Sequence, residues 1–273
     1  MTPFLTLPAR GAVLALAFVP SLIGCARTAV ARGASPSPVV TRIVTHVVTH
    51  DAKLIGSAVG GARVTIRDVA TGRVLAEGRH EGATGDTKRI MQEPHVRGGT
   101  LFTTPDGARF DASVALSAPT MVDVVAEGPL GYPDQMVRTS KRLVLVPGRD
   151  VGGDGIVLEL HGYVIDLLAP DTTTTHTRAT ALTVRARVRM LCSCPTQPGG
   201  MWEVREVLAR LLRDGAVVRE VPLAYAGEAS TYAGELPMPE GGTYVLELLA
   251  ATPERASFGV VRRRITVAGA RSR

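Results

Sequence analysis

Apolar and polar residues alternate along residues 181–194, and this two-residue period constrains the fold more than any other feature. Every second residue before Cys194 is apolar: these residues are Cys192, Met190 and four aliphatic residues. The positions between them hold Ser, Leu, Thr and three Arg. Because successive side chains of a strand point to opposite faces, the period predicts a half-buried strand whose apolar face ends in Met190, Cys192 and Cys194.

Strand patterns cover most of the chain from residue 40 onward, whereas helical patterns are scarce. Between residues 62 and 78 we expect a hairpin, with Gly72 supplying the positive φ of its turn. Residues 202–215 also fit an apolar helical face, but the neighbouring strands and a hairpin signal at Asp214-Gly215 favour a strand. Further strands are expected over residues 40–50, 108–116, 120–128, 141–148 and 155–160. The pattern predicts an all-β protein of two tandem β-sandwich domains.

The first 25 residues have the features of an export signal. Arg10 is the only charged residue there, and the apolar run 11–24 is too short, with Pro20 inside, to span a bilayer. The run ends in "LIGC", which resembles the lipobox of bacterial lipoproteins. The resemblance implies that residues 1–24 are a removed signal peptide and that Cys25 carries a thioether-linked diacylglycerol. The alternative is an ordinary signal peptide with an incidental cysteine.

The residues after Cys25 bear on the cellular location of the protein. Ala26 stands where an aspartate commonly retains lipoproteins at the inner membrane, so the resemblance implies the periplasmic face of the outer membrane in a Gram-negative cell. Residues 25–40 then form the lipidated cysteine and a flexible tether, because the segment is small, Pro-containing and without apolar periodicity. Two or three acyl chains give durable membrane anchoring.

The region 41–160 contains "GARVTIRDVATGRVLAEG" and "VPGRDVGGDGIVLEL". In these two stretches it resembles transthyretin-like, carboxypeptidase-regulatory-like β-sandwiches. It departs from them by a long polar segment, residues 79–100, which is either functional or mobile, with mobility the favoured interpretation.

The region 161–268 contains "PEGGTYVLEL", with Glu240, Gly242 and Tyr244 at alternate positions. This pattern resembles the tyrosine corner of immunoglobulin-like sandwiches, in which the tyrosine hydroxyl bonds to nearby backbone. Leu246 stands where antibody domains have a cysteine, so no inter-sheet disulfide of that kind is expected. Residues 269–273 form a basic tail.

Three fates are open to Cys192 and Cys194. As buried free thiols they would behave as small apolar groups, which is the favoured interpretation. A disulfide would need a bend at Ser193, because residues two apart in an extended strand lie at the outer limit for bridging. Two thiolates with Met190 or Met201 could instead hold Cu(I), since thiolate and thioether ligands favour that ion.

Three other groups of residues carry weaker signals. His46 and His50 share a strand face and could bind a metal, but no third ligand has a suitable spacing, which favours two exposed polar residues. Asp150 and Asp154 lie among glycines, where turn residues are favoured over a calcium loop. The three arginines 262–264 are expected to be solvated, with contact to anionic lipid or polymer as the alternative.

The chain lacks the motifs of common enzyme classes, such as Gly-x-Ser-x-Gly and His-Glu-x-x-His, and we expect no catalysis. Without residues 1–24 the net charge is 30 − 25 = +5. An exported basic protein meets anionic envelope surfaces and not nucleic acid. Low aromatic content disfavours carbohydrate binding.

We therefore expect a non-catalytic, membrane-anchored envelope lipoprotein that acts as a binding or assembly module. Its protein partner would dock on strand edges or on the segment 79–100. The alternative is a copper-handling lipoprotein that binds Cu(I) through the Met-x-Cys-x-Cys strand end.

Overall fold

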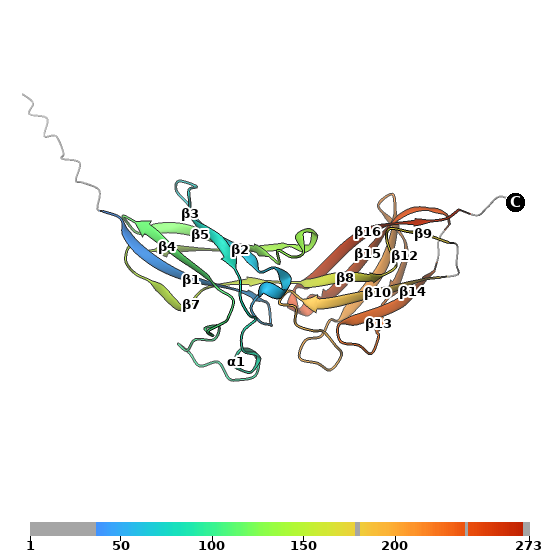
Figure 1. Cartoon of the computed structure of the whole chain (residues 1–273), viewed down its shortest axis with the longest axis horizontal. Helices are drawn as coiled ribbons and strands as arrows, with labels where there is room; N and C mark the ends of the chain where they lie inside the picture. Colours follow the sequence, from blue (N-terminus) through green and yellow to red (C-terminus); the bar gives the residue numbers. More distant parts are fainter. Residues whose placement is uncertain (1–36, 178–180, 238–239, 270–273) are drawn as a thin grey trace, which may run out of the picture. The chain divides into compact units, whose positions relative to one another are not determined.

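Both regions fold into β-sandwiches, as the sequence pattern predicts (Figure 1). The structure is a computed structural model that describes residues 37–177, 181–237 and 240–269. The expected signal peptide, Cys25, most of the expected tether and residues 270–273 of the expected tail lie outside the described residues.

The first sandwich packs a three-stranded sheet of order β4-β1-β7 against a four-stranded sheet of order β3-β2-β5-β6. Strands β1 and β7 are parallel, and the other pairs are antiparallel. The strands are β1 (Val39–Thr49), β2 (Ala62–Asp68), β3 (Val74–His80), β4 (Phe110–Leu116), β5 (Thr120–Gly128), β6 (Val137–Leu145) and β7 (Val151–Leu160). In β5, Val122, Val124 and Ala126 point into the core, because every second side chain faces the other sheet.

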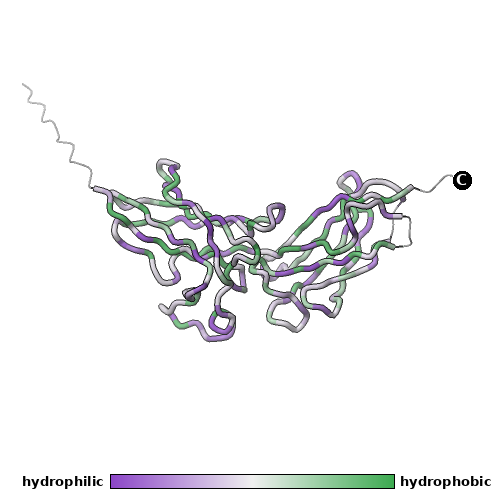
Figure 2. Tube along the Cα trace, in the orientation of Figure 1, coloured by the Kyte–Doolittle hydropathy of each residue, from purple (hydrophilic) through white to green (hydrophobic). Residues whose placement is uncertain are grey.

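The second sandwich packs sheet β13-β14-β10-β8 against sheet β12-β11-β15-β16-β9. Its strands are β8 (Tyr163–Ala169), β9 (Thr175–His176), β10 (Ala181–Met190), β11 (Glu206–Arg213), β12 (Ala216–Pro222), β13 (Ala224–Tyr225), β14 (Thr231–Pro237), β15 (Gly242–Thr252) and β16 (Ser257–Val267). The apolar stripe of β10 lies in its core with Trp202 and Tyr244. Figure 2 shows the resulting alternation of hydrophobic and hydrophilic residues along the strands.

Helical structure within the described residues is confined to short segments. They are α1 (Thr87–Met91), η1 (Ser57–Val59), η2 (Pro133–Gln135) and η3 (Pro253–Arg255). Asp86 precedes helix α1, and its carboxylate accepts the backbone N–H groups of Lys88 and Arg89. This N-cap satisfies donors that a helix start leaves free.

Several expected elements lie where the sequence places them. Residues 206–213 form strand β11 and not a helix, and the turn to β12 has positive φ at Asp214 and Gly215. The turn from β2 to β3 has φ +71° at Gly72. Strand β1 begins at Val39, inside the segment expected as tether, so the folded part starts slightly earlier than predicted.

The end of β10 differs from the expectation. The strand ends at Met190 and the chain then turns, with φ +67° at Ser193, instead of continuing to Cys194. Leu191, expected on the polar face with the arginines, is 0% exposed and belongs to the core of the first sandwich. The two-residue period therefore holds up to Met190 and fails where the chain leaves the sheet.

Candidate functional site

The segment between β3 and β4, residues 81–109, is held in place by two side chains; we call it the insert. The carboxylate of Asp154 accepts the backbone N–H groups of Leu101, at 2.6 Å, and Phe102, at 2.8 Å. The guanidinium of Arg89 donates to the backbone carbonyl and the hydroxyl of Thr100, at 2.5 and 2.8 Å. The insert is thus tied to β7 and to its own helix. Whether it is mobile, as the sequence favours, stays a prediction.

Hydrogen bonds also show what the carboxylates of Asp150 and Asp154, the two aspartates considered as calcium ligands, contact in the structure. Asp154 directs its carboxylate at backbone donors of the insert, and Asp150 accepts the backbone N–H of Arg42 at 2.8 Å. Both carboxylates therefore organise backbone, Asp150 from the segment before β7 and Asp154 from within β7, where the sequence favoured a turn.

The outer side of the insert carries an apolar residue next to a pocket. Val96 is 78% exposed, more than any other large hydrophobic residue among those described. The pocket beside it has a volume of about 470 Å³, and its lining includes Arg89, His95, Val96 and Leu101. The held insert thus presents an apolar residue to solvent with polar groups around it.

Cys192 and Cys194 form a disulfide in the turn after β10. Their Cα atoms lie 5.3 Å apart, within the usual range for bridging, because the positive φ at Ser193 folds the chain back. Both residues are buried, as the sequence predicts. The free thiols favoured by the sequence are not what the structure contains.

The bonded sulfurs offer no thiolate, so the copper hypothesis concerns only the reduced protein. Met201 lines the same pocket as both cysteines, together with Trp202. Met190 is buried in the second core. Of the two methionines considered as ligands, only Met201 thus shares a cavity with the cysteine pair.

His46 and His50 are not brought together as a metal-binding pair. The Nδ1 atom of His46 lies 2.8 Å from the carbonyl oxygen of Asp154, and His46 is buried, not exposed. Its ring neighbours are His80 and Phe102. His50 directly follows β1, and its ring contacts Glu159 and His161 instead.

His80 is a buried histidine that the sequence did not single out. Its Nε2 atom accepts the backbone N–H of Val47 at 3.0 Å, and its Nδ1–H donates to the carbonyl of Ile55 at 3.0 Å. Burial, followed by the proximity of His46, lowers the pKa of His80 to about 4. The neutral ring therefore joins β1 to the chain that follows it.

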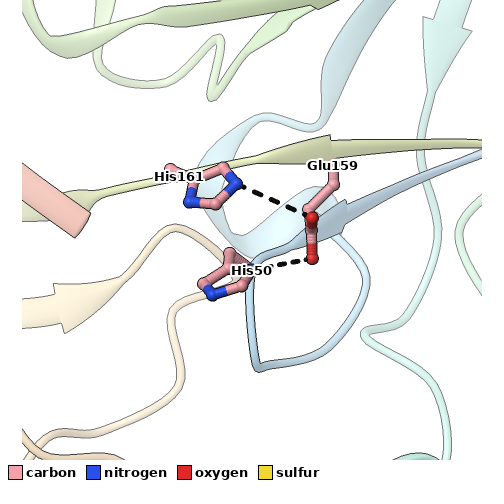
Figure 3. Close-up of side chains that lie close together, drawn as sticks. All are labelled: His50, Glu159 and His161. Atoms are coloured by element: carbon pink, nitrogen blue, oxygen red, sulfur yellow. Dashed lines mark hydrogen bonds and ion pairs between the residues drawn. The ribbon is translucent and has the colours of Figure 1, made fainter. Parts of the chain in front are cut away.

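His50, Glu159 and His161 form a cluster at the ends of β1 and β7 (Figure 3). The Nδ1 atom of His50 lies 3.0 Å from Oε1 of Glu159, and the Nε2 atom of His161 lies 3.6 Å from Oε2. The two imidazole rings stack with centroids 4.1 Å apart. Within the described residues, this cluster brings three metal-ligating atoms within 4.8 Å of one another.

Sequence reasoning missed this cluster because its members are far apart in the chain. The parallel pairing of β1 with β7 places Thr49 opposite Leu160, and therefore His50 beside His161. The sequence shows a histidine directly after each of the two strands. It does not show that these two strands pair.

The tyrosine-corner residues have the geometry that defines such a corner. The hydroxyl of Tyr244 donates to the backbone carbonyl of Glu240 at 2.8 Å, and the ring is buried. The guanidinium of Arg213 lies over that ring, 5.0 Å from its centroid. Gly242 has φ +151°, and a Cβ there would meet the guanidinium of Arg213 at 2.6 Å.

The arginines 262–264 are partly used within the fold. Arg262 pairs with the buried carboxylate of Glu247 at 2.7 Å, and Arg263 pairs with Asp134 at 2.7 Å. Two of the three cations therefore have acidic partners, which weakens the case for an anion-binding surface there.

Among the described residues no helix is both long enough and apolar enough to cross a bilayer.

No protein-family model matches the chain, and no curated protein matches it. Among solved structures it is similar to an engineered protein, with 23% identity and a TM-score of 0.29, over 42% of this chain and 22% of that one. It is also similar to the fibronectin(III)-like modules of CbhA from Clostridium thermocellum, with 14% identity and a TM-score of 0.29, over 86% and 96% of the two chains. A chimeric titin Z1Z2-Z1Z2 tandem has 10% identity and a TM-score of 0.24, over 85% and 98%. At these scores the similarities carry no argument about function.

Proposed function

We propose that this chain is a non-catalytic lipoprotein of the bacterial cell envelope, which binds a protein partner through the insert. In this proposal Cys25 is the lipidated first residue of the mature protein and anchors it to the membrane. The segment after it carries the first sandwich, a transthyretin-like module, away from the lipid surface. The second sandwich is an immunoglobulin-like module.

The observation that carries the docking proposal is the exposed surface of the insert, which hydrogen bonds hold in place. Ordering a loop costs backbone entropy of about 1–2 kcal/mol per residue, which its own contacts must offset. The Asp154 and Arg89 contacts contribute to this offset in a segment that presents Val96 to solvent. A surface that is ordered before binding loses less entropy when a partner docks.

The strand edge at β12 is a less suitable docking surface than the insert. Strand β12 forms the edge of its sheet, but Arg219 and Glu220 lie on it and its pairing with β11 contains an irregularity between Leu211 and Leu212. Charged residues and bulges on an edge strand oppose the addition of another strand.

The docking proposal is tested by site-specific photo-crosslinking in intact cells of the native host. A photoreactive residue at position 96 is expected to give one discrete crosslinked product. The matched control is position 217, because Val217 is also an exposed valine, 51% accessible, but lies on β12 of the second sandwich. The control position is expected to give no such product.

A second variant tests whether the held conformation matters. Asp154→Asn removes the charge that accepts the two insert N–H groups, and we expect crosslinking at position 96 to fall by at least half. Hydrogen exchange of Leu101 and Phe102 should become faster in the same variant. An identical product at positions 96 and 217, or none at either, would refute the docking surface.

A further inference from the structure

The ends of β1 and β7 place two imidazoles and a carboxylate together on the first sandwich (Figure 3). We propose that His50, Glu159 and His161 form a binding site for a divalent transition-metal ion of the Zn²⁺ type. This site is separate from the insert surface around Val96, and the inference does not depend on the proposed function.

The backbone holds the three residues in register. Strands β1 and β7 run parallel with Thr49 opposite Leu160, and the N–H of His50 donates to the carbonyl of Leu160 at 2.8 Å. Glu159 and His161 are two residues apart on the second chain segment. The main chain therefore fixes where each side chain starts, and only side-chain rotation is needed to change the ligand spacing.

The distances already approach those of a metal site. Ligand atoms around a tetrahedral Zn²⁺, with bonds of about 2.0–2.2 Å, lie roughly 3.3–3.6 Å apart. The two nitrogen-to-carboxylate distances are 3.0 and 3.6 Å, and the three ligand atoms lie within 4.8 Å of one another. The two rings are stacked 15° from parallel, so their lone pairs lie in separate planes. Rotation of one imidazole about its side-chain bonds is therefore needed before both nitrogens face one ion.

The second ring nitrogen of His161 has the partner that metal-binding histidines require. Its Nδ1 lies 3.2 Å from the carbonyl oxygen of Arg255, which only accepts a hydrogen bond. Nδ1 therefore carries the hydrogen, and in the neutral ring Nε2 has its lone pair directed toward Glu159. Metal-bound histidines almost always donate their other N–H in this way, to a carbonyl or a carboxylate.

The charges of the cluster also favour a cation. If both stacked rings were imidazolium, two positive charges would lie about 4 Å apart, the separation of the centroids. One divalent ion replaces the protons, and the carboxylate then neutralises part of its charge. The competing interpretation is an ordinary ion pair, in which one protonated imidazole binds Glu159 and no metal is involved.

The donor set and its exposure define the class of ion. Two nitrogens and one carboxylate oxygen suit Zn²⁺ and neighbouring first-row ions, whereas Ca²⁺ and Mg²⁺ prefer sets of oxygens. All three side chains are partly exposed, so an ion enters from water and keeps at least one position open to solvent. Such an open position would accept a ligand from another molecule.

The test is titration calorimetry with Zn²⁺ on the full chain, purified without a histidine tag. We expect one ion per chain with micromolar or tighter affinity. Glu159→Gln, which keeps the size of the side chain, and His161→Ala should each weaken binding at least tenfold. The matched control is His95→Ala, which removes a histidine of the insert and should leave the affinity unchanged.

A spectroscopic readout separates this site from general histidine binding. On addition of Zn²⁺, the ring signals of His50 and His161 should shift in NMR spectra, whereas those of His46, His80 and His176 should not. Circular dichroism confirms that each variant is folded. Binding only at millimolar Zn²⁺, or undiminished binding in both variants, would overturn the proposal.

Discussion

Lowering the pH from 7.5 to 4.5 is expected to reduce the free energy of unfolding by about 2–3 kcal/mol through His80 alone. The folded-state pKa of His80 is about 4, whereas its ordinary value is 6.5. Between these values the unfolded chain binds a proton that the folded chain does not. The stability therefore falls as the pH falls through 6.5, and the loss stops growing below about pH 4.

The cause of this effect is structural, because the ring is fully buried and both nitrogens are used. Nε2 accepts a backbone N–H and Nδ1–H donates to a carbonyl, so a proton on Nε2 would displace Val47. The nearby His46 ring opposes a positive charge as well. Carboxylates with lowered pKa values, such as Asp68, Asp123 and Asp171, titrate below this window and do not obscure it.

The measurement is urea unfolding at pH 7.5 and pH 4.5 for the natural chain and for His80→Gln. The glutamine removes the titration but retains an amide that both accepts and donates hydrogen bonds. We expect the variant to be less stable at pH 7.5 and to lose about 2–3 kcal/mol less between the two pH values. Equal losses in the two proteins would show that His80 does not titrate as the structure implies.

Replacing Leu191 by Ala is expected to lower the free energy of unfolding by about 2–5 kcal/mol. The side chain is 0% exposed and packs in the core of the first sandwich, although it directly follows β10 of the second. The two-residue pattern alone places it on the solvent-facing side, where truncation would cost about 0.5 kcal/mol or less. The two interpretations thus differ by more than the error of a denaturation experiment.

The matched control for Leu191 is Arg187→Ala. Arg187 lies on β10, on the exposed face that the pattern assigns to both residues. We expect its removal to change the free energy of unfolding by no more than about 0.5 kcal/mol. If the two substitutions have similar small effects, Leu191 is not a core residue.

Local sequence patterns predicted the strands well because the period of a strand is a local property. Strand β5 occupies Thr120–Gly128, as expected, and the hairpin of β2 and β3 turns at Gly72. Prediction failed where partners are distant in the chain. Leu191 follows a strand of the second sandwich but packs in the core of the first. A leucine on the face that carries the arginines was a sign of burial, but the two-residue period assigned it to the exposed face.

The same reason explains which candidate residues were predicted. His50 was considered, but its partners Glu159 and His161 come from a parallel strand whose pairing no local pattern reveals. Asp154 was noted in a glycine-rich turn, yet its role depends on Leu101 and Phe102 of the insert. The disulfide required a bend at Ser193, a residue with no special preference for positive φ.

The central claim, a binding module anchored to the envelope through Cys25, is tested most directly by mass spectrometry of the N-terminal peptide. The chain is extracted from membranes of its native host and digested. We predict a peptide that begins at Cys25 and carries the added mass of a diacylglyceryl group. An unmodified peptide beginning at another residue, from a chain found in the aqueous fraction, would contradict the account.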